Sequence, residues 1–171
     1  MTSPGPAGEA AGDAPAVRFL EASGLDALSE EARRRPRRRA NANLHAPDDA
    51  VHRLLNAIEP GSYVRPHRHL VPPKDETVIV VRGALGLVLF DGEGRVTEVR
   101  LLRGGSGGAF GADLPAGTMH TFVALESGTV FFETKAGPYV APSGGDVAAW
   151  APAEGDPAAA AFEASLRALF A

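Results

Sequence analysis

The sequence predicts a mainly β protein, built as an antiparallel sandwich or barrel. From Gly61 onward, short runs rich in β-branched and aromatic residues alternate with residues that are typical of turns. Between two of these runs lies DGEG (Asp91 to Gly94), which indicates a β-hairpin. Because no helical pattern separates the runs, we expect antiparallel strands rather than parallel strands joined by helices. The expected strands lie in SYVRPHRH, ETVIVVRG, ALGLVLFD, RVTEVRLL, GGAFGADLP, HTFVALES and TVFFETKAG.

Helices are expected before this β region. Leu25, Leu28 and Ala32 recur at helical spacing, and they predict a short helix that ends near Pro36. A second helix is predicted by the apolar spacing in PDDAVHRLLNAIEPG, with an aspartate available as its cap. His52 lies on the less apolar side of that helix, so we expect it at the surface.

The C-terminal end also predicts a helix. Asp156 and Pro157 provide an N-cap and a first-turn proline. Phe162, Leu166 and Phe170 follow on one apolar face, which must pack on the outside of the β domain or on a second subunit.

These elements divide the chain into four expected segments. Residues 1–15 hold few large apolar groups and are expected to be a disordered tail. Residues 16–60 form a helical and strand-containing extension that packs on the β-barrel core of residues 61–140. Residues 141–171 form a C-terminal extension with a helix over about 157–170.

Composition excludes several classes of protein. The 171 residues carry 17 basic and 21 acidic side chains and no cysteine, which excludes disulfides and thiolate chemistry. The net charge of −4 and the lack of interleaved aromatic residues favour a solvated helix end over a nucleic-acid site for RRRPRRR (Arg33 to Arg39). The first fifteen residues lack the basic start and apolar stretch expected of a signal peptide, and the apolar runs are shorter than a membrane span needs. We therefore expect a cytoplasmic protein, and its Ala, Arg and Gly content is typical of a bacterial one.

Three histidines and one glutamate predict a metal site. His67 and His69 are two residues apart, so on a strand both side chains point to the same face. Glu76 opens the next apolar strand, where an ionised carboxylate is costly unless it is paired or bound to a metal. His120 begins a further strand directly after a turn. This ligand set suits one divalent ion, namely Fe, Zn, Mn, Ni or Co.

The same residues resemble the two motifs of the cupin superfamily. The first motif is matched from Gly61 to Gly83, although the spacing between the second histidine and Glu76 is longer than usual, and the second motif is matched by PAGTMH. More narrowly, the chain resembles the WbuC family of cupin-fold metalloproteins from about Arg37 to the C-terminus. That resemblance implies a small jelly-roll barrel (a double-stranded β-helix) with an internal metal, often found among bacterial polysaccharide genes. It is carried by RRRANANLH, RLLNAIEPGSYVRPHRH, PPKDE, PAGTMHT, FFETKAGPY and WAPAEGDP.

Several further residues are candidates for binding substrate. Strand parity places Tyr63 and Arg65 on the face of the ligand histidines, and a guanidinium in that position needs an anion. Tyr63 and Lys74 are the best candidates for a general base. Lys135 is a substrate-binding candidate, although the parity of its strand leaves open whether Glu133 and Lys135 line the pocket or form a solvated outward pair.

Two main functions follow from these residues. The leading one is a metalloenzyme, of the isomerase or dioxygenase type, that acts on a small anionic or sugar-type molecule. The alternative is a non-catalytic barrel that binds or senses a small ligand and holds a structural metal. A third, weaker reading is an oligomerisation scaffold. The expected partner is a small molecule rather than nucleic acid or membrane, and the docking faces of the terminal helices also allow a homodimer.

Overall fold

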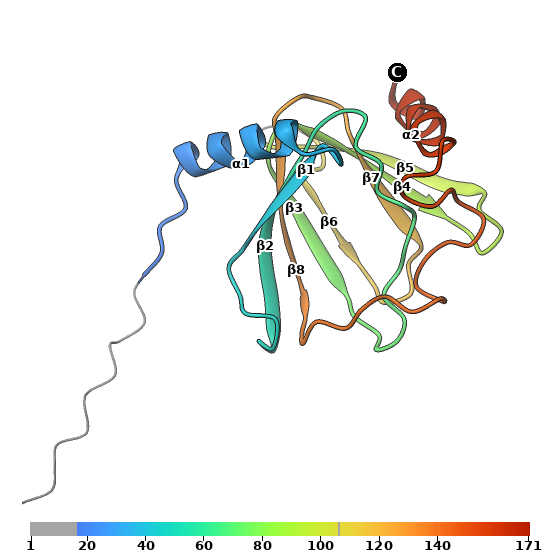
Figure 1. Ribbon diagram of the computed structural model, residues 1–171, viewed down its shortest axis with the longest axis horizontal. Helices are drawn as coiled ribbons and strands as arrows, with labels where there is room; N and C mark the ends of the chain where they lie inside the picture. The colour runs from blue at the N-terminus through green and yellow to red at the C-terminus, as the bar shows by residue number, and fades with distance from the viewer. Residues whose placement is uncertain (1–16, 106) are drawn as a thin grey trace, which may run out of the picture.

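The computed structural model describes residues 17–105 and 107–171, and the tail expected over residues 1–15 lies outside this range (Figure 1). Within the described residues, strands predominate and the helices lie near the two ends of the chain. In chain order the elements are α1 (Ala22–Arg34), β1 (Arg39–Asn43), β2 (Val51–Ile58), β3 (Glu76–Arg82), β4 (Ala84–Phe90), β5 (Val96–Arg103), β6 (Gly111–Leu114), β7 (His120–Ala124), β8 (Thr129–Ala136), α2 (Ala159–Arg167) and η1 (Ala168–Phe170).

The strands form two antiparallel sheets that face each other. One sheet has the order β1-β2-β8-β3-β6, and the other has the order β5-β4-β7. Strand pairing in the described part of the chain stays within each sheet, so the sheets form an open jelly roll and not a closed barrel. The mainly β fold class is confirmed, as is the β4–β5 hairpin at DGEG, where Asp91 accepts hydrogen bonds from two backbone N–H groups in the turn.

The main hydrophobic core lies between the two sheets. Ile58, Val78 and Phe131 from the larger sheet pack against Leu87 and Phe122 from the smaller one. Burial of these side chains on the inner faces drives the sheets together. The larger sheet is covered on its outer side by α1, whose predicted apolar residues contact strands β1, β2 and β8.

The C-terminal helix packs on the outer face of the smaller sheet. Leu166, Phe162 and Phe170 contact Val88 and Val123 there. Gly86 in β4 has no side chain, and a Cβ atom at this position would lie 2.6 Å from the Phe170 ring. The predicted C-terminal helix is therefore confirmed, and of the two expected docking surfaces it covers the outside of the β domain.

The prediction of a second helix in PDDAVHRLLNAIEPG is wrong. Its residues form β2, which lies between β1 and β8 with antiparallel pairing to both. The apolar side chains that match a helical spacing also satisfy a strand, because β2 contacts the helix α1 on one face and the inter-sheet core on the other. His52 in this strand is 4% exposed, which also corrects its expected surface position.

The expected strand SYVRPHRH is mostly irregular. Only His67 within it forms β-bridges, one to His120 at the start of β7 and one to Val147. Pro66 lacks a backbone N–H, so continuous strand pairing is not available at that point. This segment passes along the edge of the smaller sheet and carries two of the predicted metal ligands.

Candidate metal centre

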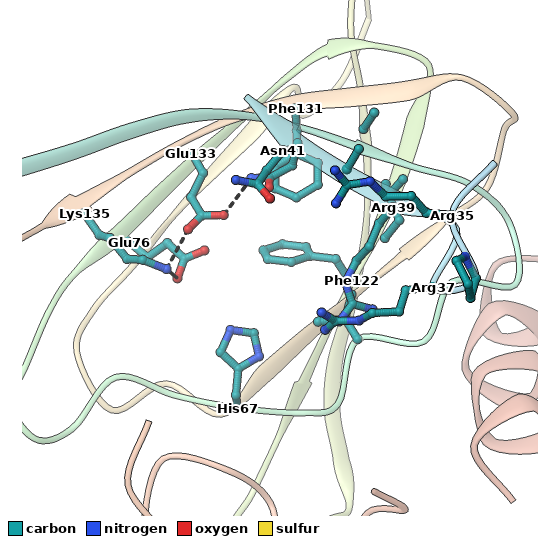
Figure 2. A pocket seen from close by; sticks show the side chains of 16 residues that line it. Arg35, Arg37, Arg39, Asn41, His67, Glu76, Phe122, Phe131, Glu133 and Lys135 are labelled. Carbon is teal, nitrogen blue, oxygen red and sulfur yellow. Dashed lines mark hydrogen bonds and ion pairs between the residues drawn. The ribbon is translucent and has the colours of Figure 1, made fainter. Parts of the chain in front are cut away.

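Three separate segments bring the predicted ligands together between the sheets. Reciprocal backbone hydrogen bonds of 2.9 Å, from each N–H to the other residue's carbonyl, hold His67 beside His120. Glu76 is the first residue of β3, in the opposite sheet, and His69 follows His67 on the irregular segment. The His67 and Glu76 side chains both point into one cavity (Figure 2).

The ligand atoms of three of the four predicted residues lie close enough to share one ion, and His120 is outside this group. Potential donor atoms of His67, His69 and Glu76 all lie within 4.8 Å of one another. His69 Nε2 is 2.6 Å from Glu76 Oε2, and His120 Nε2 is 4.0 Å from the same oxygen. The ring centroids of His67 and His120 are 4.6 Å apart.

Backbone carbonyls orient two of the imidazoles for metal binding. His67 Nδ1 lies 3.1 Å from the Arg65 carbonyl and His120 Nδ1 lies 2.9 Å from the Thr118 carbonyl, so each Nδ1–H donates there. That tautomer leaves Nε2 as the free acceptor, as in metal-bound histidines. His120 Nε2 is buried and has no hydrogen-bond partner among the described residues. Such an orphaned buried acceptor fits a divalent ion at this point.

Burial keeps these histidines neutral, the form that binds metal. It lowers the pKa of His67 to about 3, helped by the neighbouring His120, and it also lowers the pKa of His120. Burial alone would raise the pKa of Glu76, but the hydrogen bond with His69 and the positive charge of Lys135 outweigh it and lower that pKa. In the metal-free protein, His67 and His120 are therefore neutral and Glu76 is ionised, which are the forms that bind a metal.

Glu133 and Lys135 both line the cavity, which settles the parity that the sequence left open. Lys135 Nζ lies 2.6 Å from Glu133 Oε1 and 3.7 Å from Glu76 Oε2 (Figure 2). Asn56 Nδ2 donates to the other Glu133 oxygen at 2.8 Å. Burial and the nearby Glu76 raise the pKa of Glu133, whereas Lys135 opposes this. A cation and a second carboxylate thus lie directly beside the ligand set.

The cavity next to the ligands has a volume of about 690 Å³, in the range of small-molecule sites (roughly 300–1,000 Å³). The polar groups near the ligands occupy one end, three arginines occupy the other, and Phe122 and Phe131 lie between them (Figure 2). A smaller cavity of about 210 Å³ also reaches His67 and Lys135, and it is lined in addition by His69 and Lys74.

The structure does not bring Tyr63 or Arg65 into the larger cavity. The Tyr63 hydroxyl donates to the Pro152 carbonyl at 2.8 Å, and burial raises its pKa to about 12. The Arg65 guanidinium donates to the Ala148 carbonyl at 2.7 Å, so it meets a backbone group and not the expected anion. The prediction that Tyr63 and Arg65 share a face with His67 and His69 is wrong, because this segment is not a continuous strand. Lys74 Nζ donates to the Pro138 carbonyl at 2.7 Å and lines only the smaller cavity.

Other cavity residues were missed by the sequence analysis. Asn56 was assigned to a helix, and the arginine run was interpreted as a solvated helix end. The run gave no signal of which arginines face the cavity, because Arg33, Arg34 and Arg38 have the same side chain and residues 35–38 form a turn before β1.

Comparison with known proteins found a partial family match and structural likenesses. A family profile described as "Domain of unknown function (DUF6016)" matches residues 20–102, and no curated protein matches. The chain is similar to KdgF from Halomonas sp., with 27% identity over 60% of this chain and 80% of that one, at a TM-score of 0.45. It is also similar to oxalate decarboxylase from Lactobacillus farciminis, with 19% identity over 59% of this chain and 29% of that one, at a TM-score of 0.45. A Bacillus subtilis oxalate decarboxylase variant gives 19% identity over 54% and 22% of the two chains, at a TM-score of 0.43.

Proposed function

We propose that this protein is a metal-binding cupin that acts on a small anionic or sugar-type molecule, with His67, His69, Glu76 and His120 holding one divalent ion. The observation that carries the proposal is the buried Nε2 of His120, which has no hydrogen-bond partner among the described residues and lies 4.0 Å from Glu76 Oε2. The ion is Fe, Zn, Mn, Ni or Co, because imidazole and carboxylate ligands suit these metals.

The position of the cavity supports an enzyme over a structural metal site. A structural site is closed by protein ligands, whereas a catalytic site keeps a position open to water or substrate. His67 and Glu76 here line a large cavity, which favours an open position. A bound metal would polarise a substrate oxygen as a Lewis acid, and the reaction is of the isomerase or dioxygenase type.

The chain's own residues would prepare the substrate. Lys135 is placed to donate a proton to the substrate or to pair with a negative charge on it, next to the metal ligands. Glu133 is placed to accept a proton from the substrate. Phe122 and Phe131 narrow the cavity and exclude water beside the polar end. Lys135 and Glu133 replace Tyr63 as the proposed proton-transfer groups. Lys74 lines the smaller cavity and not the larger one.

A finer assignment also belongs to this proposal. The motifs that resemble the WbuC family support membership of that family and a role in bacterial polysaccharide synthesis. A cytoplasmic location and a homodimer are separate proposals that do not rest on these motifs. No helix within residues 17–105 and 107–171 has the length and apolar content needed to cross a membrane.

The test is the metal content of purified protein. Wild type should carry about one equivalent of a transition metal, and the double variant His67→Ala/His69→Ala should carry almost none. His45→Ala is the matched control, because His45 bonds only to Arg53 backbone atoms and lies outside the site. Unchanged metal content in the double variant would refute the proposal.

A further inference from the structure

Three arginines line the end of the cavity that lies away from the metal ligands. Arg35 follows α1, Arg39 begins β1 and Arg37 lies between them. We call these three residues the arginine rim. Figure 2 shows the arginine rim on one side of the cavity and His67, Glu76, Glu133 and Lys135 on the other.

The arginine rim carries more positive charge than its protein partners neutralise. Arg37 and Arg39 share one carboxylate, Glu154, with Arg37 Nη2 at 2.6 Å from one of its oxygens and Arg39 bound to the other. Arg35 pairs with Glu31. Three guanidiniums thus face two carboxylates, and arginine does not lose its proton in proteins. The remaining positive charge favours binding of an anion from outside the chain.

Some arginines of the run Arg33 to Arg39 line the cavity and others do not. Arg35, Arg37 and Arg39 line the cavity together with Pro36, whereas Arg34 and Arg38 do not line it. Arg35 and Arg37 side chains remain 52% and 62% exposed, so most of their N–H donors stay available to a ligand. Guanidinium groups match carboxylate and phosphate oxygens in a bidentate geometry.

The wall between the two ends is apolar. Phe122 and Phe131, with ring centroids 5.4 Å apart, line the cavity together with Ile58 and Val64. A ligand that spans this space therefore presents a ring or other weakly polar body to the phenyl groups, with polar groups at its two ends.

We propose that the arginine rim binds the carboxylate or phosphate of the ligand, whose opposite end reaches the metal ligands across the phenyl groups. This inference rests on the proposed function for the metal end only. It defines the ligand class as a small ring compound with a terminal anion, for example an acidic or phosphorylated sugar. It also gives the arginine run a role in recognising a small molecule.

The test compares two matched double variants by calorimetric titration of metal-loaded protein with glucose, glucuronate and glucose 6-phosphate. Arg35→Gln/Arg37→Gln removes two rim charges, and Arg34→Gln/Arg38→Gln removes two charges from the same run outside the cavity. We expect at least one anionic sugar to bind wild type at least about tenfold more tightly than glucose, and the rim variant to weaken it by about tenfold or more, as loss of a charge-assisted hydrogen bond predicts. The control variant should bind like wild type, and the preferred anion identifies a carboxylate or a phosphate ligand.

Metal content separates this inference from the proposed function. The rim variant should keep the metal content of wild type. If purified wild type holds no metal, the proposed function fails, and the same titrations of the metal-free chain then decide the role of the arginine rim. Equal binding by the rim variant and wild type, equal losses in both double variants, or no binding of either anionic sugar would overturn the inference.

Discussion

Replacing Lys135 with methionine should destabilise the metal-free protein, because it leaves a carboxylate without its cation. Glu133 is 9% exposed, and Lys135 Nζ lies 2.6 Å from its Oε1 atom. The same ammonium group lies 3.7 Å from Glu76 Oε2, so it also screens two nearby carboxylates from each other. Methionine keeps much of the length of the side chain but removes the charge.

The size of the effect follows from burial. Removing one partner of a fully buried ion pair costs roughly 3–5 kcal/mol. Because the Lys135 side chain is 23% exposed, water takes over part of its role, and we expect a loss of about 2–3 kcal/mol. In a chain of this size, that corresponds to a fall in Tm of roughly 4–12 °C.

Chemical denaturation after metal removal by a chelator gives the required free energies of unfolding. The set consists of Lys135→Met, Glu133→Gln and the double variant, with Lys74→Met as the control because Lys74 bonds only to an exposed backbone carbonyl. The double variant should lose less than the sum of the single losses, by about 1–2 kcal/mol, because both charges are then absent. Additive losses, or a Lys135→Met loss equal to that of Lys74→Met, would refute the reasoning.

Two further predictions concern stability. Between pH 6.5 and about 3 the unfolded chain binds a proton at His67 that the folded metal-free protein excludes, since burial lowers the folded pKa to about 3. His67 alone should therefore lower stability by about 1 kcal/mol from pH 7 to pH 5.5, and His120, whose pKa burial also lowers, adds to that fall. His67→Gln should reduce the fall in denaturant titrations, and an unchanged dependence of stability on pH would contradict the lowered pKa of His67. Glu59 is 2% exposed and accepts hydrogen bonds from the Gly128 N–H at 2.9 Å and the Ser127 hydroxyl at 2.6 Å. Glu59→Ala should cost about 2–3 kcal/mol, against almost nothing for the exposed Glu98→Ala, and equal denaturation midpoints would show the prediction wrong.

Local sequence patterns were sufficient for the strands from β3 onward and for α1 and α2. Histidine and ionised glutamate among apolar strands are costly unless a ligand compensates them, so residue type and spacing predicted a metal site, and its ligand set stays a prediction. The contacts that bring the predicted ligands together are long-range, yet each of these residues lies at or near the start of a strand or bridge that the sequence indicated.

Non-local contacts explain what could not be predicted. The apolar residues of β2 fit a helix equally well, and pairing with β1 and with β8, far along the chain, selects the strand. Strand parity was applied to Arg65 across Pro66, where the chain is irregular, so the guanidinium points to Ala148. The arginine rim depends on Glu154, more than one hundred residues away in sequence, and on the closure of the cavity by both sheets.

The most direct test of the account is anomalous X-ray diffraction from crystals of the purified protein, collected at the absorption edge of the metal that copurifies. The account predicts one anomalous peak between the sheets, bonded to His67, His69, Glu76 and His120. A peak elsewhere, or none at this position in crystals that contain the metal, would contradict the central claim.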